Sequence, residues 1–132
     1  MFGSDNVQSM TVAIQDPGGD DKQIFLWRAP AACEIHRAYA ITDTAQGAGT
    51  AGSFALHIYS NAGTPALSGT VAAAVGGTAA PLAADVPSAF TISEGTLAAG
   101  EWLVCQYDED SDWSGGTQVM ICWDYTLGIA AS

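Results

Sequence analysis

The sequence predicts an all-β protein, a two-sheet antiparallel β-sandwich of jelly-roll type with about eight short strands and a mobile N-terminal arm. Three observations predict this class. Apolar residues recur at every second position in most apolar segments, which is the period of a β-strand. β-Branched and aromatic residues dominate these segments. Turn-forming residues separate the segments at intervals of roughly 8–15 residues.

The length of 132 residues fits one domain, because domains usually have about 100–200 residues. Hydrophobic residues make up 48% of the chain and charged residues 13%, a composition that excludes intrinsic disorder. The first nine residues carry little pattern. We therefore expect an N-terminal arm over residues 1–9 and a single β-sandwich domain over residues 10–132.

The first predicted strand, residues 9–15, alternates through Met10, Val12 and Ile14. Residues 23–28 form a short continuous apolar run, which is typical of a strand buried on both faces. Turn residues separate the two, because Pro17-Gly18-Gly19 lies between them. The remaining predicted strands are residues 33–41, 54–59, 70–75, 89–92, 102–107 and 118–127.

Residues 114–117, which read Ser-Gly-Gly-Thr, separate the last two strands as in a hairpin with a long tip.

Three of the alternating strands have clear faces. Each alternating strand is expected to place one set of side chains on one face of its sheet. These sets are Cys33, Ile35, Arg37, Tyr39 and Ile41; then Phe54, Leu56 and Ile58; and finally Val119, Ile121, Trp123, Tyr125 and Leu127.

The charge balance excludes some partners. The chain has 3 Lys and Arg residues against 14 Asp and Glu residues, for a formal net charge of −11. Nucleic-acid binding needs cations that displace phosphate counterions, so nucleic acid is not an expected partner. Anionic membranes are disfavoured for the same reason. The favoured interpretation of this acidity is solubility, because acidic surfaces repel one another. The alternative is that any charged partner is cationic or carries a metal ion.

The three cysteines, Cys33, Cys105 and Cys122, each lie in an apolar strand segment. We expect buried free thiols in a protein made in a reducing cytoplasm. A Cys105–Cys122 disulfide between neighbouring strands is the alternative. Residues 1–6 have neither the basic nor the apolar part of a secretory signal, which agrees with a cytoplasmic site of synthesis.

An acidic segment carries Asp108, Asp110 and Asp112, spaced like the opening of a calcium loop. Calcium needs six to eight oxygen ligands, which such carboxylates help to supply. Two positions depart from that pattern, because Trp113 stands where the loop glycine is expected and Val119 where the bidentate glutamate is expected. A solvated acidic hairpin tip is therefore the favoured interpretation. We expect no cofactor, with calcium as the only candidate.

The two histidines, His36 and His57, are the candidates for acid–base chemistry. No nucleophile motif stands beside either of them. Cys33 lies three residues before His36, an odd spacing that places the two on opposite faces of a strand. We therefore expect no enzymatic activity.

The four tryptophans divide into two groups. Trp27, Trp102 and Trp123 lie in strand patterns and are expected in the core. Trp113 lies in the acidic segment, where an exposed indole is a candidate contact for a partner protein or a glycan.

The order of the motifs resembles that of a known family. Residues 25–35 place an apolar strand before an Ala-Pro-x-x-Cys-x-Ile step. Residues 97–103 read Leu-Ala-Ala-Gly-Glu-Trp-Leu, and residues 119–125 form a closing strand. Over about residues 22–127 this pattern resembles small β-sandwich virion proteins of tailed bacteriophages.

The resemblance implies a capsid decoration, or cement, protein. Such a protein is structural, stabilises the outer capsid surface by binding between subunits of the major capsid protein, and is commonly a homotrimer. Its location would be the virion, after assembly in the host cytoplasm. We expect the arm, with Phe2, Asp5 and Val7, and the Trp113 loop to contact the partner. The alternative is a fibre or tail protein, or a glycan-binding β-sandwich module.

Overall fold

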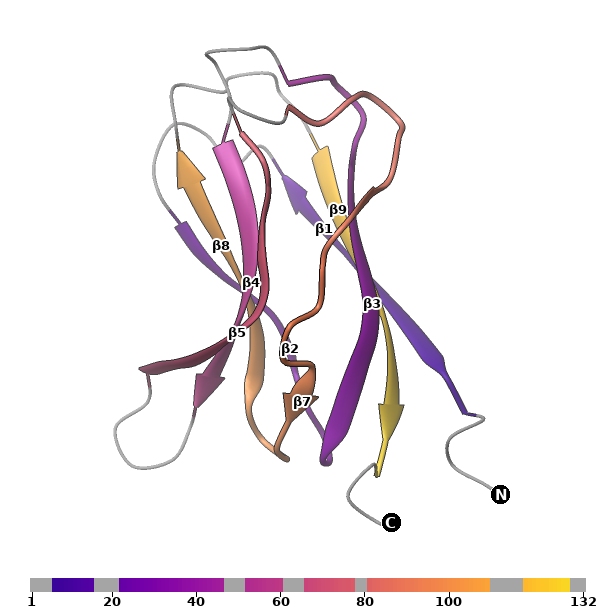
Figure 1. Ribbon diagram of the computed structural model, residues 1–132, viewed down its shortest axis with the longest axis vertical. Coiled ribbons are helices and arrows are strands. Elements are labelled where there is room, and N and C mark those ends of the chain that lie inside the picture. Colours follow the sequence, from indigo (N-terminus) through magenta and orange to yellow (C-terminus); the bar gives the residue numbers. More distant parts are fainter. Residues whose placement is uncertain are drawn as a thin grey trace.

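Two antiparallel β-sheets pack face to face in the computed structural model (Figure 1). The structure describes residues 6–15, 22–46, 52–60, 66–77, 81–109 and 118–128. All regular elements in these ranges are strands. The described residues therefore contain no helix that is long and apolar enough to span a membrane. The predicted all-β sandwich is confirmed.

The described residues form nine strands in two sheets. The β9 sheet has the order β1-β9-β3-β6, with β7 also paired to β3, and the β8 sheet has the order β2-β8-β4-β5. The strands are β1 (Gln8–Gln15), β2 (Lys22–Arg28), β3 (Cys33–Thr42), β4 (Gly52–Ser60), β5 (Ala66–Gly76), β6 (Ser88–Ala89), β7 (Thr96–Leu97), β8 (Trp102–Glu109) and β9 (Gln118–Leu127).

The strand pairing is nested, as in a jelly roll. β1 pairs with β9, β2 with β8, β3 with β6, and β4 with β5, all antiparallel. Each pair lies within the chain segment that the previous pair encloses. Two further pairings, β3 with β9 and β4 with β8, complete the two sheets. This order is the jelly-roll arrangement that the sequence predicted.

The last two strands do not form the expected hairpin. β8 pairs with β2 and β4, whereas β9 pairs with β1 and β3, so the connection between them crosses from one sheet to the other. The prediction failed because an alternating strand has the same pattern whether the next strand lies beside it or across the core.

Alternate side chains of both sheets fill the space between them. Phe54, Leu56 and Ile58 of β4 are buried, as predicted. On β9, Val119, Ile121, Trp123 and Tyr125 are buried and Leu127 packs against them, which also confirms the prediction. β1 contributes Met10, Val12 and Ile14, of which Ile14 is fully buried. The largest wholly buried side chains are Trp123, Tyr107, Phe54, Ile35 and Leu56.

A β-bulge in β3 changes which residues face the core. The register with β9 shifts between Ile35 and Arg37, so that His36 is an extra residue. His36 and Arg37 are both exposed, and the inward positions beyond them are Ala38, Ala40 and Thr42. The predicted face of Cys33, Ile35, Arg37, Tyr39 and Ile41 is therefore wrong after Ile35, and Tyr39 and Ile41 lie on the outer face.

A second bulge explains the apolar run of β2. The register with β8 shifts between Phe25 and Trp27, which lets Leu26 and Trp27 both face the core. Phe25 is 45% exposed and Arg28 is exposed. β2 is an edge strand of the β8 sheet, so its interpretation as a strand buried on both faces is wrong.

The boundaries differ from the prediction in the middle of the chain and at its start. β5 begins at Ala66, and the short strand β7 was not predicted. β6 covers Ser88–Ala89, whereas we expected a strand over residues 89–92. β1 includes Ser9, where the predicted strand begins, and starts one residue earlier, because Gln8, which we placed in the arm, already pairs with Tyr125.

A buried glutamine fastens one end of the sandwich. Gln46 Nε2 donates to the carbonyl oxygen of Gly52 at 2.8 Å. Its Oε1 accepts from the backbone N–H of Leu82 at 2.9 Å and of Gly77 at 3.1 Å. Gly77 has φ of 95°, a conformation that glycine adopts without strain. One amide thereby joins the segments that follow β3 and β5 to the start of β4.

We expect Gln46→Met to lower the free energy of unfolding by about 2–4 kcal/mol, because it leaves two buried N–H groups and a buried carbonyl without their partner. Urea denaturation followed by tryptophan fluorescence measures this change. The control is Gln23→Met at an exposed position of β2, for which we expect a change below about 0.5 kcal/mol. Equal effects of the two substitutions would contradict the role of the amide.

Candidate binding surfaces

The predicted contact residues are only partly within the described structure. Val7 lies just before β1 and is 52% exposed. Phe2, Asp5 and Trp113 lie outside the described residues. For these three the expectation of a partner contact stays a prediction.

The predicted calcium ligands are likewise divided. Asp108 is exposed near the end of β8, whereas Asp110 and Asp112 lie outside the described residues. Within the described ranges, no three His, Cys, Asp or Glu side chains come together as a metal site. The calcium hypothesis therefore rests on the sequence pattern alone.

The two histidines lie on different sheets, His36 on β3 and His57 on β4. Nε2 of His36 lies 2.9 Å from Oγ1 of Thr126, and Nδ1 of His57 lies 3.5 Å from Oγ1 of Thr70. Cys33 is buried and His36 is exposed, so these two residues lie on opposite faces, as predicted.

All three cysteines are free thiols. Cys33 and Cys105 are buried, as predicted, whereas Cys122 is only partly buried. Cys105 lies in the β8 sheet and Cys122 in the β9 sheet, so the alternative of a bridge between neighbouring strands is wrong. Burial raises the pKa of the Cys105 thiol to about 12. The pKa of Cys33 rises to about 11, mainly through burial, which outweighs an opposing hydrogen bond with the Leu97 backbone.

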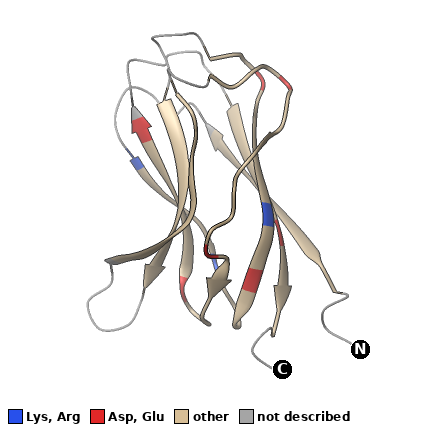
Figure 2. Cartoon of the chain, in the orientation of Figure 1, with Lys and Arg blue, Asp and Glu red and all other residues tan. Residues whose placement is uncertain are grey.

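The outer face of the β9 sheet is largely apolar and neutral. Because Val119, Ile121 and Trp123 point inward, Met120 and Cys122 point outward, beside Tyr39 and Ile41 of β3 and Thr11 and Ala13 of β1. Met120 is 36% exposed. The five strands of this sheet contain three Asp, Glu, Lys or Arg residues, which are Glu34, Arg37 and Asp124 (Figure 2). We call the surface formed by Thr11, Ala13, Tyr39, Ile41, Met120 and Cys122 the outer β9 face.

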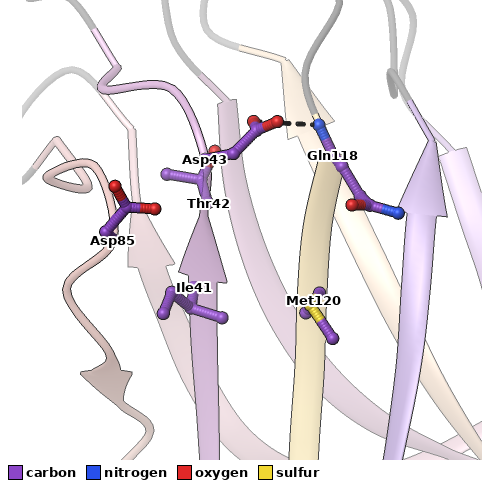
Figure 3. Close-up of a pocket in the computed structure, with 6 residues that line it drawn as sticks. All are labelled: Ile41, Thr42, Asp43, Asp85, Gln118 and Met120. Atoms are coloured by element: carbon purple, nitrogen blue, oxygen red, sulfur yellow. Dashed lines mark hydrogen bonds between the residues drawn. The ribbon is translucent and has the colours of Figure 1, made fainter.

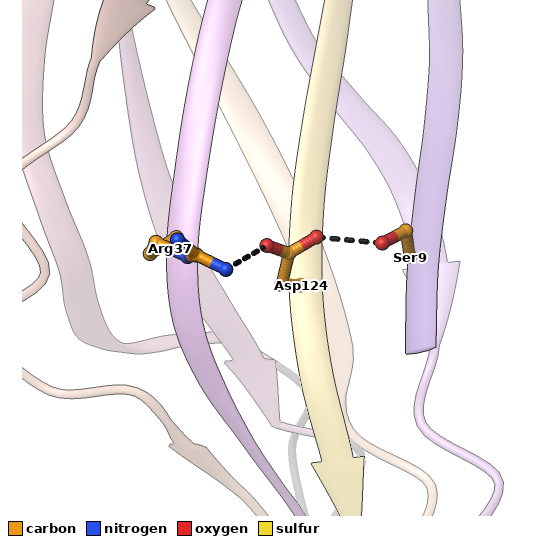
Figure 4. A network of polar contacts seen from close by, with 3 residues as sticks. All are labelled: Ser9, Arg37 and Asp124. Carbon is orange, nitrogen blue, oxygen red and sulfur yellow. Dashed lines mark hydrogen bonds and ion pairs between the residues drawn. The ribbon is translucent and has the colours of Figure 1, made fainter. Parts of the chain in front are cut away.

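A neutral polar row borders this face at one end. Arg37 Nη2 lies 3.1 Å from Oδ2 of Asp124, and Ser9 Oγ donates to Oδ1 of the same carboxylate at 2.7 Å (Figure 4). The row therefore crosses β3, β9 and β1. An exposed ion pair adds little stability, at most about 1 kcal/mol. Its consequence is that the Asp124 carboxylate, at this end of the outer β9 face, is matched by a cation.

A small pocket of about 100 Å³ lies at the other end of the outer β9 face. Ile41 and Met120 form its apolar wall, and the exposed carboxylates of Asp43 and Asp85 stand at its rim (Figure 3). Asp43 Oδ1 accepts from the backbone N–H of Gln118 at 3.2 Å. The backbone N–H of Asp85 donates to the carbonyl oxygen of Thr42 at 2.8 Å. The Asp43 carboxylate is thus tied to the start of β9, and the Asp85 backbone is tied to the end of β3.

The β8 sheet carries an aromatic cluster on its own outer face. The Phe25 ring lies 4.9 Å from the Tyr59 ring and 5.6 Å from the Trp102 ring, both in edge-to-face geometry. Val104, between Phe25 and His57 in the register, is completely buried beneath this layer. Trp102 therefore lies on the surface side of the sheet, and its predicted place in the core is wrong. Trp27 and Trp123 pack in the core, as predicted.

A comparison of the chain with protein-family models, with curated proteins and with solved structures finds no match.

Neither surface was predicted as a site from the sequence. The outer β9 face was missed because the bulge at His36 reverses the direction of Tyr39 and Ile41. The aromatic cluster joins residues from three strands, Phe25, Tyr59 and Trp102, that are far apart in the sequence. The sequence did contain a signal for Trp102, because apolar Leu103, Cys105 and Tyr107 alternate along β8 and Trp102 falls on the opposite face. In the structure these three residues are buried, and Trp102 points outward.

We expect the buried thiols to make stability fall at alkaline pH. Their folded pKa values, about 11 and about 12, exceed the ordinary value of 9.0, so above pH 9.0 the unfolded chain releases protons that the folded chain retains. The stabilisation is complete below pH 9 and is lost as the pH rises toward the folded values. For two thiols the loss between pH 8 and pH 10 is about 3 kcal/mol.

Urea denaturation of the reduced protein at both pH values measures this loss. The Cys33→Ala/Cys105→Ala variant is the control, because it lacks both thiols. It should be less stable at pH 8 and show a fall smaller by about 3 kcal/mol. An identical pH dependence in the two proteins would show that the thiols do not cause it.

Proposed function

We propose that this chain is a structural virion protein that decorates the outer capsid surface of a tailed phage and binds between subunits of the major capsid protein. The resemblance of residues 22–127 to small phage virion proteins gives the class. The outer β9 face supplies the surface for the contact. It is the observation that carries the proposal.

The outer β9 face fits a protein partner because its centre is apolar and uncharged on a chain of net charge −11. Apolar residues at the centre and polar residues at the rim are typical of protein–protein interfaces. Met120, Ile41 and Tyr39 form the centre, and the Ser9–Asp124–Arg37 row forms part of the rim.

The carboxylates at the pocket define the charge of the partner. Asp43 and Asp85 stand beside Ile41 and Met120, so a Lys or Arg side chain would place its alkyl part on the apolar wall and its charge between the carboxylates. A capsid subunit that presents such a side chain is the partner proposed. Each copy would bury a modest area, and many copies on one shell would supply avidity.

Mass spectrometry with gel densitometry of purified phage particles tests the location. We expect a copy number close to that of the major capsid protein. A few copies per particle would indicate a fibre, a tail or a vertex instead, and absence from the particle would contradict the proposal.

Met120→Glu tests the surface. We expect at least a tenfold loss of affinity for capsids in a co-sedimentation assay, because the substitution places a charge at the centre of an apolar contact, a change of about 1.4 kcal/mol or more. Leu67→Glu is the matched control, since Leu67 is 39% exposed, Met120 is 36% exposed, and Leu67 lies on the β8 sheet. A loss of capsid affinity in the control alone would move the contact to the other sheet.

A second function is favoured by the aromatic cluster. Aromatic faces stack on sugar rings, and Phe25, Tyr59 and Trp102 lie beside exposed Arg28 and half-buried His57, which carry hydrogen-bonding groups. This arrangement supports the alternative of a glycan-binding module in a fibre or tail.

In that case Trp102→Ala should lower glycan affinity at least tenfold in a glycan-array or calorimetric measurement, because an aromatic anchor is worth about 1–2 kcal/mol or more. Met120→Glu is the control and should leave glycan affinity unchanged. Absence of any glycan binding by the unmodified protein would remove this second function.

A further inference from the structure

We propose that two copies of this chain associate through the free edge of β1, antiparallel about a two-fold axis at Val12, so that their β9 sheets become one continuous sheet. This association does not depend on the proposed virion role. Among the described residues, β1 has β9 as its only strand neighbour. Its other edge presents backbone N–H and C=O groups that a further strand would pair.

β1 lacks the features that protect strand edges. Natural edge strands carry charged residues, prolines or bulges that prevent a second strand from pairing. The sequence of β1 is Gln-Ser-Met-Thr-Val-Ala-Ile-Gln, with no charge and no proline. Its register with β9 runs without a shift from Gln8 to Gln15. β1 is therefore long, regular and open to pairing.

The other edges of the two sheets are protected. β2 carries Lys22 and Arg28 and a bulge near Leu26. β5 contains Gly69 and is paired to β4 with three register shifts. At the far edge of the β9 sheet, β3 is covered in part by β6 and β7. The contrast assigns strand pairing to β1.

The core is incomplete beside this edge. Met10 and Val12 point toward the core from β1 but are only half-buried. Trp27, on edge strand β2 of the opposite sheet, is also half-buried and packs against Trp123 and Tyr125, at 5.9 and 4.6 Å between ring centroids. A strand added next to β1 would cover part of this apolar surface.

The charge distribution permits a second copy to approach this edge. Two molecules that each carry a net charge of −11 repel one another wherever carboxylates face each other. β1 brings none to the contact, and Asp124 on the neighbouring strand is paired with Arg37. Two copies can therefore approach closely at β1 with little repulsion between them.

The faces of the two strands fix the register. Residues directly opposite in an antiparallel pair lie on the same face, so a two-fold axis must pass through one residue of β1. An axis at Thr11 or at Val12 gives the longest pairing. The axis at Val12 sets Met10 opposite Ile14 and Val12 opposite Val12 on the core face, whereas the axis at Thr11 sets polar Gln8 opposite Ile14. On the core face, the pairing at Val12 therefore matches apolar residues only.

On the outer surface the same register sets Thr11 opposite Ala13 of the second copy, twice. A two-fold axis perpendicular to the sheet also places both outer β9 faces on the same side. The dimer would then present two copies of the outer β9 face to a single large partner, which raises avidity without any new kind of contact.

Two double variants test the pairing. Thr11 and Ala13 are exposed, so substitutions there leave the fold intact. Thr11→Lys/Ala13→Lys puts Lys directly opposite Lys at two places, and Thr11→Lys/Ala13→Glu puts Lys opposite Glu at the same two places. Sedimentation velocity of the full chain, over a micromolar concentration range and without particles or capsid protein, measures the association.

We expect a dimer for the unmodified chain, at least a tenfold higher dissociation constant for the Lys/Lys variant, and a retained dimer for the Lys/Glu variant. The two added lysines make the net charge of the Lys/Lys variant less negative than −11. Weaker association of this variant therefore could not come from repulsion between the net charges of the two copies. A monomer or a homotrimer for the unmodified chain, equal effects of the two variants, or loss of the dimer in both would overturn the proposal. None of these outcomes depends on capsid binding.

Discussion

The buried amide of Gln46 is the contact on which one whole end of the sandwich depends. It satisfies two backbone N–H groups and one carbonyl that the packed loops have removed from water. Such groups cost about 1–3 kcal/mol each when left without a partner. Asp43 lies three residues before Gln46, and Asp85 lies three residues after Leu82, which Gln46 holds. The positions of both carboxylates at the pocket therefore depend on a hydrogen-bond network inside the molecule.

The two outer faces of the sandwich differ in chemistry, and this difference separates the two functions considered. The outer β9 face is apolar with a single ring, Tyr39, and has a matched ion pair at one end and two carboxylates at the other. The outer face of the β8 sheet carries a cluster of rings, with Arg28 beside Trp102 in the register. An apolar surface with a charged rim favours a protein partner, whereas a cluster of exposed rings favours a stacking ligand. One fold can thus carry two independent surfaces.

Much of the fold could be predicted from the sequence because strands buried on one face alternate. Phe54, Leu56 and Ile58, and the inward set of β9, were predicted correctly for this reason. Alternation contains no signal for the neighbour of a strand, so the crossing of the chain between β8 and β9 was missed. The bulges at Leu26 and His36 were missed because no residue type specifies an extra residue in a ladder.

The candidate surfaces were harder to predict than the core. The bulge at His36 turned Tyr39 and Ile41 outward, and a surface expected to be internal became external. The residues predicted as partner contacts or calcium ligands came from polar or unpatterned segments, and of these Val7 and Asp108 lie within the described residues. Surface function depends on which side chains from distant strands meet, and spacing along the chain does not contain that relation.

The nested pairing has a consequence for biosynthesis. β1 leaves the ribosome well before its partner β9, which follows about a hundred residues later, since Gln15 pairs with Gln118. At a synthesis rate of about 5–20 residues per second, β1 waits for several seconds before its neighbour exists. During that time an uncharged, β-prone segment is exposed to other nascent chains. Such long-range pairing slows folding and leaves the chain prone to aggregate until β9 has been made.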